Sequence, residues 1–119
     1  MSTESFRELT KQTSARLTTL RANIPDTMKG FGDLSRHAMA HGALDMKTKE
    51  LIATALSVAT QCDPCIGYHT HALVKLGATR QELDETLGIA IYMGGGPSLM
   101  YAASAVASFD EFAALAEAK

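Results

Sequence analysis

Apolar side chains recur at intervals of three and four residues along almost the whole chain. In the first 24 residues Phe6, Leu9, Leu17, Leu20 and Ile24 follow this spacing, which places them on one face of an α-helix. No alternation long enough for a sheet is present, and neither is an internal repeat or a low-complexity linker. The pattern therefore predicts an all-α protein.

Capping residues, prolines and glycines divide this pattern into about six helices. The first is predicted over residues 5–23, with Ser5 and Glu8 as a capping box. Pro25 breaks that helix, and a second is predicted over residues 26–41. Asp45 is a good N-cap for the third. The third helix is expected to bury one stripe, made of Leu51, Ile52, Ala55, Leu56 and Ala59.

The second half of the chain supplies three more helices. The fourth is predicted to start within the CDPC stretch at residues 62–65 and to stop at Gly77. Thr79 opens a fifth that runs to about Met93, and Pro97 is expected at the first position of a sixth. The sixth helix is rich in alanine and serine, so we expect it to approach another helix closely, either in a second subunit or in the same chain.

Length and charge narrow the class of protein. A chain of 119 residues is expected to form a single domain over residues 1–119. Its net charge of −2 disfavours nucleic acid as a partner. The N-terminal stretch is charged from residue 4 onward and has no apolar core of a secretory signal, so a cytoplasmic location is expected. Residues 86–109 lack charge, but Gly-Gly-Gly-Pro at 94–97 favours two buried helices over a membrane span.

Both cysteines and two of the four histidines lie in the stretch CDPCIGYHTH, residues 62–71. On a helix Cys62, Cys65 and His69 share one face, because they are spaced i, i+3 and i+7. Thiols in the first turn of a helix meet unpaired N–H groups and the positive end of the helix dipole, which favours reactive thiolates. The spacing therefore indicates a redox-active pair with a histidine base.

Two other interpretations of this stretch were weighed. A zinc site would need a fourth ligand, since His71 points about 200° away from His69 on a helix, and no metal is expected. A disulfide between Cys62 and Cys65 closes too small a loop to stabilise the fold much, although it would make a good redox switch.

Glu50 is the candidate partner for His69. If the third and fourth helices form a hairpin that turns near residues 60–61, Glu50 falls opposite His69. A carboxylate bonded to one imidazole nitrogen fixes the tautomer and makes the other nitrogen a better proton acceptor. Glu50, His69 and Cys65 would then form a chain of orienting group, base and nucleophile. A solvated carboxylate in the first turn of a helix is the equally supported alternative.

The segment from Glu50 to His69, with its Glu, Cys-x-x-Cys and His, resembles the signature of the AhpD-like alkylhydroperoxidases within the carboxymuconolactone decarboxylase family. The likeness extends over about residues 43–112. It implies an all-helical fold that assembles as a homotrimer or homohexamer. It also implies a peroxidase or disulfide oxidoreductase that acts on hydroperoxides without a metal or organic cofactor.

Roles follow from the resemblance for four residues. Glu50 and His69 would deprotonate Cys65 for attack on the peroxide, and Cys62 would resolve the product as a disulfide. A dithiol donor of the lipoyl or thioredoxin type would reduce that disulfide. The alternatives are an enzyme of the decarboxylase branch acting on a small lactone acid, and a helical assembly protein whose thiols only sense redox state.

Overall fold

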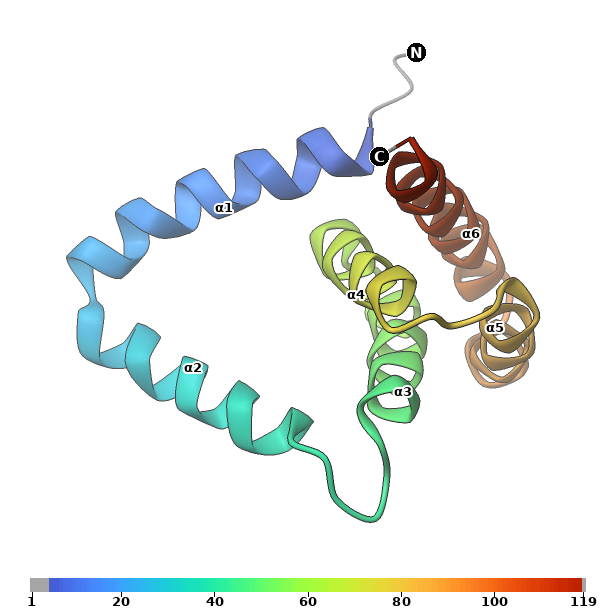
Figure 1. Cartoon of the computed structure of the whole chain (residues 1–119), viewed down its shortest axis with the longest axis horizontal. Coiled ribbons are helices and arrows are strands. Elements are labelled where there is room, and N and C mark those ends of the chain that lie inside the picture. Colours follow the sequence, from blue (N-terminus) through green and yellow to red (C-terminus); the bar gives the residue numbers. More distant parts are fainter. Residues whose placement is uncertain (1–4, 119) are drawn as a thin grey trace.

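A computed structural model describes residues 5–118. Within this range the chain forms six α-helices and no strand, so the all-α prediction and the number of helices are confirmed. The helices are α1 (Phe6–Asn23), α2 (Pro25–Met39), α3 (Met46–Ala59), α4 (Asp63–Lys75), α5 (Arg80–Gly94) and α6 (Gly96–Glu117), as Figure 1 shows.

The helix boundaries follow the predicted capping chemistry to within about two residues. Asp45 accepts a hydrogen bond from the Thr48 N–H at 2.8 Å. Thr79 and Glu82 form the reciprocal capping box of α5. Gly77, with φ of 76°, ends α4 in the left-handed conformation that glycine adopts most easily. Pro97 is the second residue of α6 rather than the first, because the helix already begins at Gly96.

Four helices build the core. α3 and α6 pack against each other and each packs against both α4 and α5. The apolar side chains of the four helices meet in one cluster. Five of these side chains are completely buried: Val58, Ile66, Leu73, Leu83 and Ala105. Full burial of a valine, leucine or isoleucine side chain contributes about 1.5–3 kcal/mol to folding. Because α4 supplies Ile66 and Leu73 to this cluster, the cluster fixes α4 in the core.

The stripe predicted for α3 is correct only in part: Leu51 and Ala55 are partly buried and pack against the core, but the other three residues are exposed. Ile52 and Leu56 are exposed, and the buried residues of the helix are Thr54, Ser57 and Val58. The two hydroxyl groups can be buried because each donates a hydrogen bond to a backbone carbonyl four residues earlier, at 2.8 Å for Thr54 and 2.7 Å for Ser57. A hydroxyl whose hydrogen bond is satisfied costs little inside a core, so Thr54 and Ser57 can occupy the buried face of α3 together with Val58.

The small residues of α6 serve the chain's own core. Ser98, Ala102, Ala105 and Ser108 are buried, and the Ser108 hydroxyl bonds to that of Thr70 on α4 at 2.6 Å. Of the described residues, Gly96–Glu117 is the one helix long and apolar enough to cross a membrane by composition. The uncharged stretch is nevertheless divided into α5 and α6 at Gly95, as predicted, and α6 packs on α3, α4 and α5.

The first two helices extend away from this core as an arch (Figure 1). α1 crosses α4 and α6, whereas α2 contacts only α1 and α3 among the described elements and has no buried residue. The radius of gyration is 14.7 Å, against about 13.5 Å expected for a domain of this length. The outward position of α1 and α2 accounts for the larger radius of gyration.

Candidate active site

The cysteine pair stands at the start of α4, as predicted. Cys62 is the N-cap residue, and Cys65 lies in the first turn, with the two Cα atoms 5.2 Å apart and the sulfurs joined in a disulfide. The Cys65 N–H donates a hydrogen bond to the Cys62 Sγ at 3.3 Å. A sulfur that accepts a helix N–H is well placed to hold negative charge, so reduction of this disulfide would leave thiols in a setting that favours thiolates.

Glu50 and His69 meet across the α3–α4 hairpin. The chain reverses at Thr60 and Gln61, and the Glu50 Oε1 lies 2.6 Å from the His69 Nδ1. The Glu50 side chain is 13% exposed and that of His69 is 32% exposed. The carboxylate is therefore mostly shielded, while the ring remains reachable from solvent. This contact excludes the alternative in which Glu50 is only a solvated carboxylate.

The bond to Nδ1 leaves the other ring nitrogen, Nε2, free of this carboxylate. Cys65 precedes His69 by one turn of α4, so both side chains lie on the same face of the helix. A carboxylate, an imidazole and a thiol in this order are the components of an activated nucleophile. The structure thus brings together Glu50 and His69 from two helices, and the two cysteines with His69 on one.

Two contacts that the sequence pattern did not reveal hold these helices in place. Lys49 Nζ donates hydrogen bonds to the carbonyls of Ala38 and Ala40, at 2.9 and 2.6 Å, and so ties the end of α2 to the turn of α3 that carries Glu50. Tyr68, beside His69, donates from its hydroxyl to the Thr10 carbonyl of α1 at 2.9 Å. These contacts could not be predicted from residue spacing, because the acceptors are backbone carbonyls in other parts of the chain, which no residue type marks.

His71 lies apart from this group, as helical phase predicts. Its ring stacks on Phe112 of α6, with ring centroids 4.2 Å apart and an angle of 10° between the planes. Within residues 5–118, no group of three or more histidine, cysteine, aspartate or glutamate side chains is arranged to hold a metal ion.

Comparison with known proteins places this helical arrangement in a family. The model of the carboxymuconolactone decarboxylase family matches residues 25–108, which include the α3–α4 hairpin and both cysteines. The chain belongs to the carboxymuconolactone decarboxylase family. The family membership inferred from the Glu, Cys-x-x-Cys and His pattern is thereby confirmed.

Solved structures of family members share the whole architecture. A carboxymuconolactone decarboxylase family protein from Legionella pneumophila is 57% identical, with a TM-score of 0.89 over 91% of this chain and 96% of that one. A family protein from Thermotoga maritima, for which a role in antioxidative response has been suggested, is 32% identical, with a TM-score of 0.78 over 90% of this chain and 93% of its own. An uncharacterized protein from Cupriavidus necator is 45% identical over 72% of this chain and 76% of that protein.

Proposed function

We propose that this family member is a thiol-dependent peroxidase that reduces organic hydroperoxides through Cys65 and Cys62, with disulfide exchange as part of its cycle. The observation that carries the proposal is the bond of 2.6 Å between Glu50 and His69, which stands one turn after the redox-capable cysteine pair. A carboxylate that orients an imidazole beside a thiol supports proton removal from that thiol.

The reaction begins with the reduced pair. His69 accepts the proton of Cys65, and the thiolate attacks the terminal peroxide oxygen, so that the O–O bond breaks. Cys65 becomes a sulfenic acid, and the alkoxide takes up a proton and leaves as the alcohol. The Cys62 thiolate then attacks the Cys65 sulfur and water leaves, which gives the Cys62–Cys65 disulfide. An external dithiol restores both thiols by exchange and is itself oxidised to a disulfide.

The proposal also includes the electron donor, the location and the oligomeric state of the protein. The electron donor is a lipoyl- or thioredoxin-type dithiol, no metal or organic cofactor takes part, and the location is cytoplasmic. The protein works as a homotrimer or homohexamer, which is supported by the exposed apolar side chains of the arch, such as Phe31 and Leu34, 67% and 62% exposed.

A donor screen tests the proposed activity. The purified protein is mixed with cumene hydroperoxide and either dihydrolipoamide or reduced thioredoxin, and loss of the hydroperoxide is followed. We expect dithiol-dependent turnover by the wild-type protein. Cys65→Ser should reduce it to the uncatalysed background, because the sulfur one helical turn from His69 is lost and Cys62 lies two turns from this base.

The second cysteine gives a sharper test of the order of events. Cys62→Ser should still consume about one equivalent of peroxide but should not form the intramolecular disulfide, because the sulfenic acid at Cys65 has no resolving partner. Wild-type rates in Cys65→Ser would overturn the assignment. Turnover of a small lactone acid by the Cys62→Ala/Cys65→Ala variant would instead identify an enzyme of the decarboxylase branch, and no peroxide turnover with any dithiol would favour a redox sensor.

A further inference from the structure

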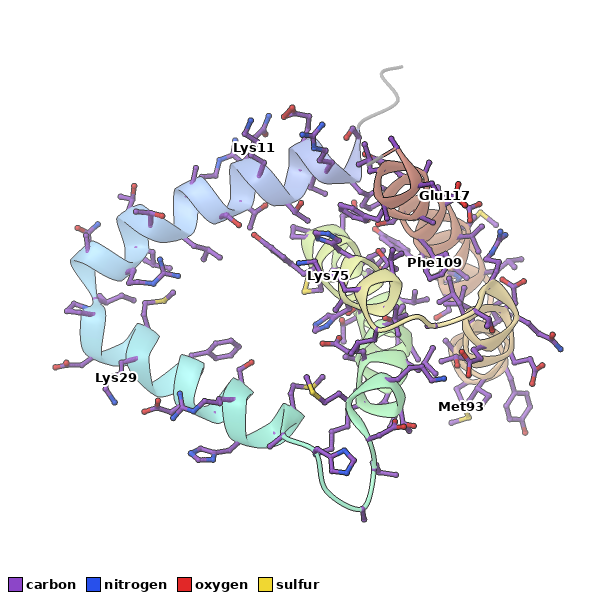
Figure 2. All side chains as sticks on the ribbon, viewed as in Figure 1. Lys11, Lys29, Lys75, Met93, Phe109 and Glu117 are labelled. Atoms are coloured by element: carbon purple, nitrogen blue, oxygen red, sulfur yellow. A yellow bond between two sulfur atoms is a disulfide. The ribbon has the colours of Figure 1, made fainter. Side chains whose placement is uncertain are left out.

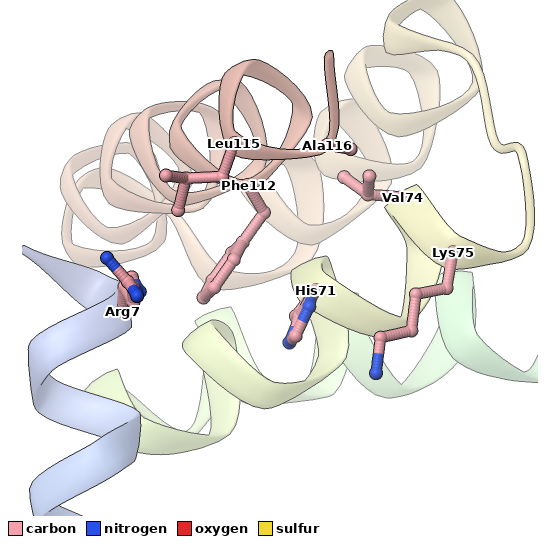
Figure 3. A pocket seen from close by; sticks show the side chains of 7 residues that line it. All are labelled: Arg7, His71, Val74, Lys75, Phe112, Leu115 and Ala116. Carbon is pink, nitrogen blue, oxygen red and sulfur yellow. The ribbon is translucent and has the colours of Figure 1, made fainter. Parts of the chain in front are cut away.

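A second recess lies on the side of α4 that carries His71. It encloses about 380 Å³ between α4, the start of α1 and the end of α6, a volume within the range of small-molecule sites. Its apolar wall comes from Val74, Phe112 and Leu115, and the stack of His71 on Phe112 gives it a flat aromatic surface (Figure 3).

Two cationic side chains stand on either side of that stack. Arg7 reaches the recess from α1 and Lys75 from the last turn of α4 (Figure 3). Among residues 5–118, no acidic side chain lines the recess, and neither Arg7 nor Lys75 forms an ion pair with a carboxylate. The charged side chains that line the recess are therefore both positive.

Glu111, whose carboxylate interacts with Arg7, does not line the recess. Burial by itself would raise the pKa of Glu111, but hydrogen bonds from Ser5 and from the N–H groups of Phe6 and Arg7, together with the positive charge of Arg7, outweigh that effect and lower it. Glu111 is thus held ionised at the start of α1, with bonds of 2.6, 2.9 and 3.2 Å to these three donors. Its oxygens bond to the Ser5 hydroxyl and to the backbone of α1. The Arg7 guanidinium attracts this carboxylate without forming an ion pair with it.

We propose that this recess binds a small organic anion in which one carboxylate is attached to an apolar body, such as a medium-chain fatty acid or an aryl carboxylate. The apolar body would lie on Val74, Phe112 and Leu115, and the carboxylate would meet the Arg7 fork or the Lys75 ammonium. The two cations flank the recess and do not converge on one point, which suits a monoanion better than a phosphate.

The site is distinct from the cysteine pair. Lys75 follows Cys65 by ten residues, or about 15 Å along the helix axis, and His71 and His69 point to different sides of α4. Binding here therefore needs neither peroxide nor dithiol, and the proposal does not rest on the proposed peroxidase activity.

Octanoate is the probe, and the full-length protein is titrated by NMR. At about ten non-hydrogen atoms, a dissociation constant on the order of 1 mM is expected. The amide signals of residues 71–75 and 112–116 should shift together and saturate. Octanol, which keeps the chain and lacks the charge, should bind at least fivefold more weakly, and octylamine should cause no saturable shift.

Variants test whether Arg7 and Lys75 are responsible for octanoate binding. Lys75→Gln, Arg7→Gln or both should weaken octanoate binding at least threefold, according to which cation meets the carboxylate. Both side chains are exposed, so the fold should tolerate the changes. Lys11→Gln, the same charge change on the exposed surface of α1 (Figure 2), is the matched control and should bind like the wild type. Equal binding of octanoate and octanol, wild-type affinity in both glutamine variants, or no shift at 10 mM octanoate would overturn the proposal.

Discussion

The proposed proton relay depends on the contact between the Glu50 carboxylate and the His69 imidazole. The two residues are 19 positions apart and come from different helices, yet the hairpin joins them at 2.6 Å. The contact also orders the ring, because a carboxylate at Nδ1 directs Nε2 away from Glu50. In the proposed cycle Glu50 therefore acts through His69 and does not touch the peroxide.

Removal of the charge on Glu50 should be visible in the reduced protein. Glu50→Gln keeps the size of the side chain but no longer stabilises a protonated His69 beside a thiolate. We expect the thiolate absorbance near 240 nm to develop at higher pH than in the wild type, and the peroxidase rate at neutral pH to fall. Glu8→Gln, an exposed carboxylate on α1, is the control. An unchanged thiolate titration in Glu50→Gln would remove Glu50 from the proposed relay.

The crossing of α1 over α4 depends on a glycine. A Cβ atom at Gly67 would lie 2.5 Å from the Thr10 Cγ2, closer than real atoms approach. Thr10 is itself buried, and its hydroxyl donates to the Arg7 carbonyl at 3.1 Å, so its methyl group cannot turn away freely. The same crossing carries the bond from Tyr68 to Thr10, and the two contacts together fix α1 against the helix of the cysteines.

Gly67→Ala should therefore separate the two helices. Overpacking of this kind costs roughly 1–3 kcal/mol, whereas alanine in place of glycine inside a helix gains about 0.5–1 kcal/mol. Gly88→Ala on α5 meets nothing within 4 Å and should show only the gain. Urea denaturation should thus find Gly67→Ala less stable than Gly88→Ala by at least about 1 kcal/mol. Thr10→Ser removes the clashing methyl group and should restore part of the loss; if both alanine variants gain stability equally, the crossing is not tightly packed.

The molecule as a whole exposes more surface than a single folded chain of its mass should. Its accessible area is 7688 Å², against about 6,200 Å² expected for a monomer of 12.7 kDa. The arch of α1 and α2 contributes to this excess, since α2 buries none of its own residues. An accessible area above this expectation, together with exposed apolar side chains such as Phe31 and Leu34, is typical of a chain that associates with copies of itself.

Sedimentation tests the proposed assembly. The wild-type protein is expected to sediment at the mass of a trimer or hexamer at micromolar concentration. Phe31→Glu/Leu34→Glu places two charges on the exposed face of α2 and should lower the mass, because charges are costly to bury in an apolar interface. Gln12→Glu adds a charge on exposed α1 and should leave the mass unchanged. A wild-type protein that sediments as a stable monomer would contradict the assembly.

Helical periodicity, caps and motif spacing were sufficient to predict the helices and part of the candidate site. They determined the six helices, because Asp45, the Thr79–Glu82 box and Gly77 act through bonds to neighbours in sequence. They also placed Cys62, Cys65 and His69 on one helical face, since spacing on a helix is a local property.

Tertiary packing decided what local rules could not. It turned Ile52 and Leu56 outward and Thr54 and Ser57 inward, which is possible because hydroxyls that bond to their own helix can be buried at little cost. It brought Glu50 to His69, where spacing alone left a solvated carboxylate equally supported. It also placed Arg7 and Lys75 around the His71–Phe112 stack, since three helices far apart in sequence meet there and no local pattern records where they cross.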